Sequence, residues 1–326
     1  MPETAVAVDL GGTNLRVAAV TEHGEVLHRR SEPTEAASGP TVVAARISAM
    51  IEETAAAAGL APTAPAGVAV PGPVDPRTGV VFFTPNLTGW RNFPLGDVVG
   101  RQSQRPVAFG NDGNCAALGE ARFGAGVGSG DLIYVALGTG VGGGIISGGR
   151  LIEGVGGIGG EIGHVVVALD GPRCTCGSIG CLEAFVAGWA IARDARLVAT
   201  TVDGAAIRRA AGDREIDASA VAQAAREGDP AAVALLSRAG RALGAAIGAF
   251  VNIFNPELVV IGGGIASLGD SLLDHARQAL PQHAFPEQRA HVRLESSRLG
   301  DDTALYGAAA LAFQSISDVE HHRPKT

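Results

Sequence analysis

Short apolar runs that end in glycine-rich turns open each half of the chain. The run Ala5–Val8 leads into a turn over residues 9–14, and apolar character resumes over Leu15–Val20. A second run, Leu132–Leu137, leads through a turn over residues 138–140 into Gly142–Ile146. Each pattern of strand, glycine-rich turn and strand predicts a β-hairpin. Because one hairpin occurs in each half, the pattern also predicts an internal structural repeat.

Apolar positions at helical spacing predict helices between the strands and through most of the second half. In the segment Pro40–Gly59, residues such as Val43, Ile47 and Ile51 lie on one helical face. Further strands are expected at Val68–Val70, Val107–Phe109 and Leu258–Ile261, and further helices over residues 114–123, 185–198, 219–227, 231–254, 268–280 and 303–313. This alternation predicts an α/β protein. We expect a small domain of residues 1–110 and 301–326 and a large domain of residues 111–300.

The charge balance excludes classes of partner. The 326 residues include 33 acidic and 25 basic side chains, which gives a net charge of −8. Proteins that bind nucleic acids are usually basic, so we expect no nucleic-acid partner. The uncharged stretch Leu132–Gly149 is rich in glycine and too polar to span a bilayer, and residues 1–8 lack a signal-peptide pattern. We therefore expect a soluble cytoplasmic protein with no membrane partner.

Lysine is almost absent from the sequence. Lys325 is the only lysine, and every other basic side chain apart from histidine is arginine. A Walker A loop, a protein kinase and a pyridoxal enzyme each need a lysine within the fold. The composition therefore argues against these three classes. Any phosphate chemistry must depend on backbone N–H groups, metal ions and arginine.

The glycine-rich turns are suited to that chemistry, because successive backbone N–H groups in such a turn can converge on a phosphate. Either of the two hairpin turns, taken alone, could be an ordinary turn without a ligand. A third glycine run, Gly262–Gly264, could equally serve tight strand–helix packing. Two turns across a cleft could hold a polyphosphate, with the carboxylate of Asp9 directed at a hydrated Mg²⁺. The positions concerned are Asp9, Gly11, Gly12 and Thr13 in the first turn, Gly138, Thr139 and Gly140 in the second, and Gly262, Gly263 and Gly264 in the third run.

Asp112 follows a predicted strand and precedes a predicted helix, in the run Gly110–Asn114. Aspartate is a good N-cap residue, so helix capping is one interpretation. The other is a carboxylate at the mouth of a cleft that acts as general base toward an alcohol.

Three of the four cysteines lie within eight residues of each other, namely Cys174, Cys176 and Cys181. With His164 as the nearest upstream histidine, they form the ligand set of a closed tetrahedral Zn²⁺ site. A disulfide between Cys176 and Cys181, or three inert thiols, are the alternatives. Glu161 and Glu183 lie beside these ligands in the sequence. They are either solvated surface residues or carboxylates that the metal loops fix for binding the hydroxyls of a sugar.

These motifs together resemble the ROK family of repressors and sugar kinases, and within it the bacterial glucokinases. The resemblance covers residues 8–311 and rests on the runs Asp9–Thr13, Pro85–Leu87, Asn111–Asn114, Leu137–Gly142, Glu161–His164, Cys174–Glu183 and Leu305–Ala309. The combination of Glu-x-Gly-His with Cys-x-Cys-Gly-x-x-Gly-Cys-x-Glu is highly specific.

The resemblance implies an actin-like ATPase (ribonuclease H-like) fold of two α/β domains with a cleft between them. It implies ATP with Mg²⁺ on the first two turns, adenosine near the third glycine run, and a structural Zn²⁺. It also implies a hexose held by Asn86, Asn111, Asp112, Glu161, His164 and Glu183. The implied reaction is phosphorylation of the 6-hydroxyl of glucose with Asp112 as general base, in a homodimer or homotetramer.

Other members of the family define the competing interpretations. A sugar-responsive transcriptional regulator carries a helix-turn-helix domain before the first turn. Here eight residues precede Asp9 and the net charge is negative, so we expect a kinase. A non-catalytic sugar-binding module would not need Asp112 and both turns. N-Acetylmannosamine, mannose, fructose or allose could replace glucose as acceptor, and polyphosphate could replace ATP as donor.

Overall fold

The N-terminal hairpin is the centre of the first of two five-stranded sheets. The computed structural model describes residues 3–103, 105–266 and 270–321. The sheet order is β3-β2-β1-β4-β7, in which β1–β2 and β2–β3 are antiparallel and β1–β4 and β4–β7 are parallel. The strands are β1 (Thr4–Leu10), β2 (Asn14–Thr21), β3 (Val26–Pro33), β4 (Ala66–Val70) and β7 (Val107–Asn111). The predicted hairpin is therefore confirmed.

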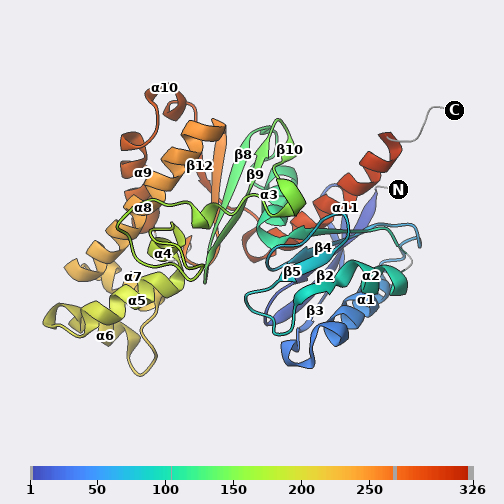
Figure 1. Ribbon diagram of the computed structural model, residues 1–326, viewed down its shortest axis with the longest axis horizontal. Coiled ribbons are helices and arrows are strands. Elements are labelled where there is room, and N and C mark those ends of the chain that lie inside the picture. Colours follow the sequence, from blue (N-terminus) through green and yellow to red (C-terminus); the bar gives the residue numbers. More distant parts are fainter. Residues whose placement is uncertain (1–2, 104, 267–269, 322–326) are drawn as a thin grey trace. The chain divides into compact units, whose positions relative to one another are not determined.

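The two faces of β1 carry side chains of different size. Val6 and Val8 belong to the apolar cluster that includes Val43 and Ile47 of α1, whereas Ala5 and Ala7 belong to a cluster with α3 and α11. Figure 1 shows α1 and α11 on opposite sides of this sheet. The elements that complete this part are α1 (Pro40–Ala57), β5 (Val80–Phe83), β6 (Arg91–Pro94), α2 (Leu95–Gln102), α3 (Asp112–Phe123) and α11 (Thr303–His321).

Glycine allows α11 to approach its neighbours closely. A Cβ atom on Gly307 would overlap the carbonyl oxygen of Cys115 on α3, and one on Gly67 would overlap the carbonyl oxygen of Ala308. Small residues at such crossings bring backbones together because no side chain separates them. The position of α3, whose first residue is Asp112, therefore depends on these glycines.

The buried carboxylate of Glu120 fixes the other end of α3. Its Oε2 accepts a hydrogen bond of 2.7 Å from the Ala125 amide, and its Oε1 accepts one of 3.3 Å from the Leu299 amide. Its side chain is fully buried. A buried carboxylate is stable only when it is paired or hydrogen-bonded, so α3, residues 124–126 and residues 298–299 are held as one group.

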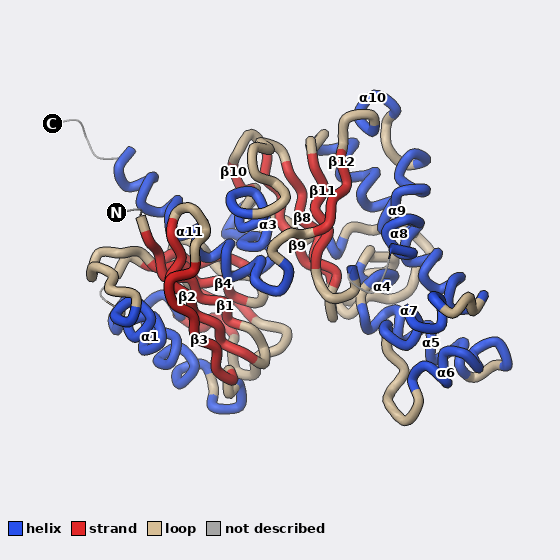
Figure 2. Tube along the Cα trace, turned by 180° about the vertical axis from the view of Figure 1, so that it is seen from behind, coloured by secondary structure: helices blue, strands red, loops and turns tan. Residues whose placement is uncertain are grey.

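The second sheet repeats the strand order of the first. Its order is β10-β9-β8-β11-β12, with β10–β9 antiparallel and β8–β11 and β11–β12 parallel. Figure 2 shows its strands in red. They are β8 (Leu132–Leu137), β9 (Val141–Ser147), β10 (Arg150–Leu151), β11 (Leu258–Gly262) and β12 (Arg293–Ser296). The second hairpin and the internal repeat are thus confirmed.

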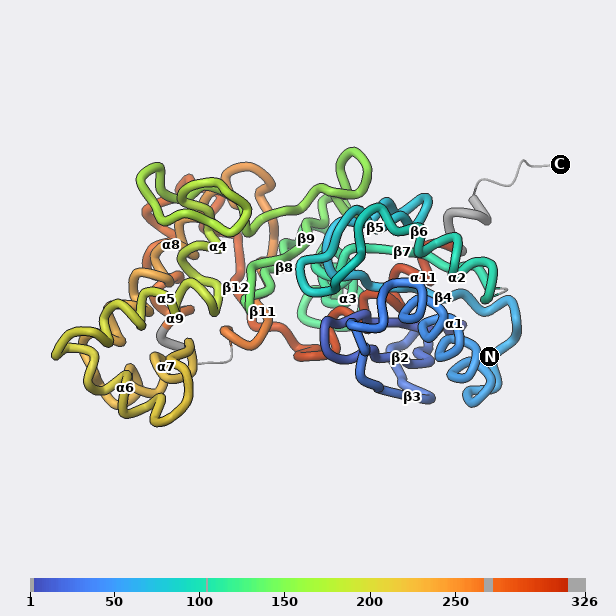
Figure 3. Tube along the Cα trace, turned by 60° about the horizontal axis from the view of Figure 1, so that its bottom comes forward, coloured from blue at the N-terminus to red at the C-terminus, as the bar shows by residue number. Residues whose placement is uncertain are grey.

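Helices form most of the remaining chain, and α5, α6 and α7 lie near one another in Figure 3. They are α4 (Glu183–Val186), α5 (Gly188–Ala199), α6 (Ala205–Ala211), α7 (Ala218–Arg226), α8 (Pro230–Phe254), α9 (Asp270–Ala279) and α10 (Pro286–Arg289). The longest, α8, begins after Asp229, whose side chain accepts a 2.8 Å hydrogen bond from the Ala232 amide. Among the described residues it is the one helix that is long and apolar enough to cross a membrane, and half of its most apolar 18-residue stretch is buried in the protein. Core helices of soluble proteins have the same length and composition.

The chain divides into two compact units. Unit 1 comprises residues 1–128, 144–160 and 298–326, and unit 2 comprises residues 129–143 and 161–297. The helix predicted over residues 185–198 is divided, because Ala187 is extended and separates α4 from α5. The final helix continues beyond residue 313 to His321. Residues 268 and 269, where a further helix was expected to begin, lie outside the described residues.

Gly307→Ala should lower the free energy of unfolding by about 1–3 kcal/mol, the usual effect of adding a methyl group to a filled core. Urea denaturation provides the measurement. Gly100→Ala is the matched control, because a Cβ atom at this helical position meets no atom within 4 Å. The control should be neutral or stabilising. Equal effects of both substitutions would contradict the close packing of α3 and α11.

Candidate functional site

The first glycine turn, residues 11–13 of unit 1, is held through its carbonyl oxygens. The buried Thr34 donates from Oγ1 to the Gly11 carbonyl at 2.7 Å and from its amide to the Thr13 carbonyl at 2.7 Å. The Gly11 amide donates to the Asn14 carbonyl at 3.0 Å. Thr34 was not predicted as part of the site, because it lies 21 residues beyond Thr13 in the sequence.

Asn86 lies against this turn. A Cβ atom on Gly12 would lie 3.2 Å from the Cβ atom of Asn86, whose side chain is exposed. The structure therefore brings together two regions that the sequence analysis assigned separately to phosphate and to sugar.

Asp9 is a largely buried carboxylate at the end of β1. It lies opposite Arg16 in the hairpin, with 3.7 Å between Asp9 Oδ2 and Arg16 Nη1, and its side chain is 15% exposed. Burial raises the pKa of Asp9 to about 6, while Arg16 acts in the opposite direction. The main chain of Asp301 also receives a 2.8 Å hydrogen bond from Arg16. A cation near Asp9 would favour its charged form.

Asn111, and not Asp112, is the N-cap of α3. Its Oδ1 accepts hydrogen bonds from the amides of Gly113 at 2.9 Å and Asn114 at 3.2 Å, and its Nδ2 donates to the Gly72 carbonyl at 3.1 Å. Asp112 is the first residue of the helix, and its Oδ1 accepts a 2.8 Å bond from the Gly113 amide. The capping role considered for Asp112 therefore belongs to its neighbour.

The second glycine turn, residues 138–140 of unit 2, is held by the first residue of α5. The Gly138 amide donates to the Gly140 carbonyl at 3.0 Å, and the Gly188 amide donates to the Gly138 carbonyl at 2.9 Å. The extended backbone at Ala187 places Gly188 for this contact. This bond lies at the first residue of α5, so the N-terminus of a helix is next to the turn.

The third glycine run packs against the same turn. Gly263 has a φ of 89°, and a Cβ atom on it would overlap the carbonyl oxygen of Leu137. The Ile265 amide donates to that carbonyl at 2.9 Å. Residues 262–264 and 138–140 are therefore neighbours within unit 2, and tight backbone packing explains Gly263 by itself.

Glu183 is buried, so the surface interpretation is wrong for this residue. Its side chain lies between the turn and the cysteine loop, because Oε2 accepts a 3.0 Å bond from the Val141 amide and Oε1 accepts one of 3.0 Å from Thr175 Oγ1. A Cβ atom on Gly140 would lie only 2.8 Å from Oε2. Glu161, in contrast, is exposed, and its Oε2 lies 4.0 Å from His164 Nε2.

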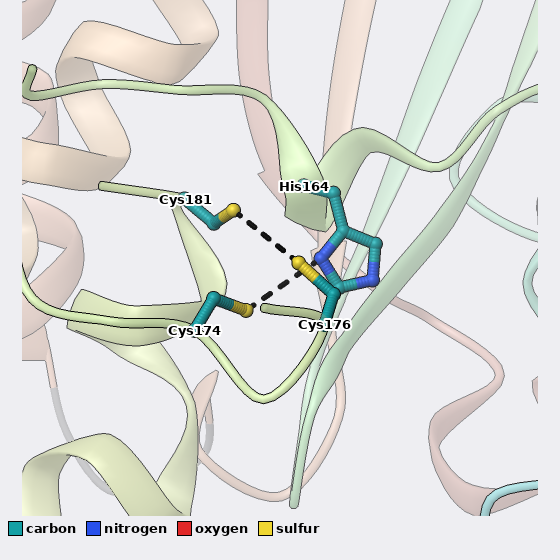
Figure 4. A group of neighbouring side chains, drawn as sticks. All are labelled: His164, Cys174, Cys176 and Cys181. Atoms are coloured by element: carbon teal, nitrogen blue, oxygen red, sulfur yellow. Dashed lines mark hydrogen bonds between the residues drawn. The ribbon is translucent and has the colours of Figure 1, made fainter. Parts of the chain in front are cut away.

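His164, Cys174, Cys176 and Cys181 form one cluster, shown in Figure 4. Their four ligand atoms all lie within 4.8 Å of one another. The distance from Cys174 Sγ to His164 Nδ1 is 3.7 Å, and that from Cys176 Sγ to Cys181 Sγ is 3.8 Å. Metal–sulfur bonds of about 2.3 Å in a tetrahedron place the ligands about 3.8 Å apart. The spacing and the donor set fit a four-coordinate metal ion, and the cysteines are free thiols instead of the alternative disulfide.

Glycines and backbone hydrogen bonds shape the cysteine loop. Gly177 and Gly180 have φ values of 95° and 75°, and a Cβ atom on Gly180 would overlap the Ala168 carbonyl oxygen. The Cys174 amide donates to the Ser178 carbonyl at 2.8 Å. A hydrogen bond from the Ser178 backbone lowers the pKa of Cys176 to about 7, which favours the thiolate form that metals bind.

The predicted site residues are distributed over both units. Unit 1 contains the first turn, Asn86, Asn111 and Asp112, whereas unit 2 contains the second turn, the third glycine run, Glu161, Glu183 and the His–Cys cluster. Thr175 and Gly188 were not predicted. The position of Thr175 between two cysteines could have marked it in the sequence as part of the site. The contact of Gly188 with Gly138 depends on tertiary structure and has no such local signal.

Each unit carries a sheet of the same topology and a glycine turn at the end of its hairpin, which is the arrangement of an actin-like ATPase fold with two α/β domains. The predicted fold class is confirmed by these features and by related structures. The model of the ROK family matches residues 5–315, and the chain belongs to this family.

Similarity to individual members extends over nearly the whole chain. Glucokinase from Thermotoga maritima is 37% identical over 313 residues, which are 95% of this chain and 98% of the relative. The crystal structure of ROK hexokinase from Thermus thermophilus has a TM-score of 0.83 and 33% identity, and covers 97% of this chain and 99% of that one. A ROK family glucokinase from Streptomyces griseus, in complex with glucose and AMPPNP, has a TM-score of 0.79 and 35% identity, with coverage of 95% and 99%.

Asp9→Asn should stabilise the protein at neutral and alkaline pH, because it removes a buried charge. Since the pKa of Asp9 is raised from 3.8 to about 6 on folding, folding takes up a proton in this range and stability falls as the pH rises through it. The variant should gain up to about 3 kcal/mol in free energy of unfolding at pH 8 and roughly half of that at pH 5. Urea titrations at both pH values measure it. An advantage that does not change with pH would contradict the burial of this charge.

Proposed function

We propose that this protein is a glucokinase, which transfers the γ-phosphoryl group of ATP to the 6-hydroxyl of glucose. Membership of the ROK family and full-length similarity to glucokinases support the reaction class. The observation that carries the assignment is the placement of Asp112. It is the first residue of α3, and the N-cap of this helix is Asn111.

In the proposed mechanism Asp112 is the general base. The oxygen of the sugar 6-hydroxyl attacks the γ-phosphorus, the bond to the β-phosphate oxygen breaks, and ADP leaves. The hydroxyl proton passes to the carboxylate of Asp112, which later returns it to solvent. An aspartate is a weak base for an alcohol, but in a loose transition state the proton can leave late.

Charge on the phosphates has to be balanced without lysine. We assign this to the two glycine turns, residues 11–13 and 138–140. The amides of Gly11 and Gly138 bond within the turns, so the other amides of these residues would support the negative charge that develops in the transition state. Mg²⁺ bound with ATP would neutralise part of the phosphate charge. Asp9 is assigned to the water shell of that ion, and residues 262–264 are assigned to adenosine.

The sugar is assigned to Asn86, Asn111, Asp112, Glu161, His164 and Glu183, as the family resemblance implies. His164 supports this assignment, because its Nδ1 lies on the side of Cys174 and its Nε2 lies on the side of Glu161. One ring nitrogen can therefore bind a metal while the other remains for a hydroxyl.

We further propose that the His–Cys cluster holds a structural Zn²⁺. Three thiolates and one imidazole are a ligand set typical of closed zinc sites. Bound there, the ion would fix the loop of residues 174–181 and hold His164 in one orientation. Assembly as a homodimer or homotetramer and a cytoplasmic location remain predictions from the resemblance and the sequence.

Acceptor and donor are tested together with a coupled assay over a hexose panel. Glucose with ATP should give the highest kcat/KM. A clear preference for N-acetylmannosamine, mannose, fructose or allose would change the assigned acceptor, and activity with polyphosphate in place of ATP would change the donor. No turnover of any hexose would refute the kinase assignment.

Asp112→Asn should lower kcat by ~10²- to 10⁴-fold, the range for a lost general base, with only a modest change in glucose affinity. Steady-state kinetics and glucose binding are the measurements. Asp97→Asn is the matched control, because this aspartate is exposed on α2, with 66% of its side chain accessible. A variant at position 112 with near-normal kcat would exclude the proposed base.

Cys176→Ser should lose the metal, since a hydroxyl is a poor substitute for a thiolate ligand. It should also weaken glucose binding, because His164 and Glu183 lose their support. Elemental analysis of freshly purified protein should find one zinc per chain in the wild type and much less in the variant. Cys115→Ser controls for loss of a thiol outside the cluster. Wild-type protein without zinc would remove this part of the proposal.

A further inference from the structure

Glu183 has a position that the family resemblance does not predict. The resemblance assigns its carboxylate to the sugar, and in the structure both oxygens in addition accept hydrogen bonds within the protein, which is compatible with sugar binding because a carboxylate has about four acceptor positions. One oxygen binds the main chain just after the β8–β9 turn, and the other binds the cysteine loop. Glu183 is 8% exposed. The bond from the Val141 amide is buried and so contributes more than it would at the surface, whereas the bond from the exposed Thr175 is partly buried.

The first connection is from Glu183 to the turn. The bond from the Val141 amide to Oε2 is 3.0 Å long, and Val141 directly follows Gly140. At the other end of the turn the Gly188 amide binds the Gly138 carbonyl at 2.9 Å. The segment of residues 183–188 is therefore hydrogen-bonded to both ends of the turn.

The second connection is from Glu183 to the His–Cys cluster. Thr175 Oγ1 donates to Oε1 at 3.0 Å, and Cys174 Sγ lies 3.5 Å from the same oxygen. Thr175 is bonded covalently to two members of the cluster, Cys174 and Cys176. Displacement of these cysteines when the metal is lost would move the hydroxyl that holds Glu183.

We propose that Glu183 is a positioning residue that couples metal occupancy of the His–Cys cluster to the geometry of the β8–β9 turn. Loss of the metal would then weaken nucleotide binding in addition to sugar binding. This inference rests on the proposed function, because it takes the turn as a phosphate-binding element. It goes further by making the metal site a determinant of nucleotide affinity, through the chain of contacts Thr175, Glu183 and Val141.

Thr175→Val tests the coupling without removing a proposed ligand, since valine has nearly the same shape but no hydroxyl. Binding of Mg²⁺–AMPPNP is measured by calorimetry without sugar, and metal content is measured on the same samples. The variant should keep its metal and bind the nucleotide ~5-fold or more weakly, a typical size for coupling between sites. Thr175→Ser, which restores the hydroxyl, should recover the wild-type affinity. Chelator-treated wild-type protein should lose affinity for Mg²⁺–AMPPNP by a factor at least as large.

Amide hydrogen exchange provides a readout that needs neither nucleotide nor activity. Exchange of a peptide covering residues 138–143 should be faster in Thr175→Val and in chelated protein than in the wild type or Thr175→Ser. A peptide from β11 (Leu258–Gly262) serves as an internal reference, because a general loss of structure would accelerate both.

The outcomes separate this inference from the proposed function. Wild-type protein that binds no nucleotide would refute the function and the coupling together. If untreated wild-type protein, Thr175→Val and chelated wild-type protein all bind Mg²⁺–AMPPNP with the same affinity, the coupling alone is overturned. Unchanged hydrogen exchange at residues 138–143 would overturn it as well. If Thr175→Val loses its metal, the chelated wild type and Thr175→Ser still decide the result.

Discussion

Close approach of backbone to backbone at glycine positions is the constraint on which this structure depends. In unit 1, Gly307 and Gly67 allow α11 to lie against Cys115 of α3 and against β4. In unit 2, Gly263 packs on the Leu137 carbonyl, and Gly140 leaves room for the Glu183 carboxylate. At these four positions, among the 47 glycines of the chain, glycine has a structural role. Glycine also leaves the main chain of the turns open to polar contacts. This is relevant in a protein whose only lysine is Lys325.

The two units share a topology but carry different chemical groups. Unit 1 carries acidic and amide side chains: Asp9 lies in the hairpin, and Asn111 and Asp112 lie where β7 meets α3. The hairpin of unit 2 is associated with Glu183 and, through Thr175, with the His–Cys cluster. The two units thus share one topology and carry different side chains. We assign those of unit 1 to the binding of Mg²⁺ and phosphate and to the general base, and those of unit 2 to phosphate binding and to support of the sugar site.

The elements whose signals are local could be predicted from the sequence. Both hairpins were predicted because apolar runs end in glycine, and the His–Cys cluster was predicted because the cysteine spacing is short. β3 (Val26–Pro33) was missed because it is an edge strand with mostly exposed residues and its stretch His28–Glu32 is polar throughout, so no alternation marks it. The division between α4 and α5 depends on the bond from Gly188 to Gly138, and no local propensity reports such a bond. Asn111 and Asp112 are equally good caps in sequence, so only the structure shows which one performs that role. The burial of Glu183 likewise depends on tertiary packing.

A structure of the protein with Mg²⁺–AMPPNP and glucose bound is the most direct measurement of the central claim. We expect β- and γ-phosphate oxygens within hydrogen-bond distance of backbone amides in residues 11–13 and 138–140, and the glucose 6-hydroxyl within hydrogen-bond distance of the Asp112 carboxylate. Phosphates held mainly by arginine side chains away from both turns, or a 6-hydroxyl remote from Asp112, would contradict the account.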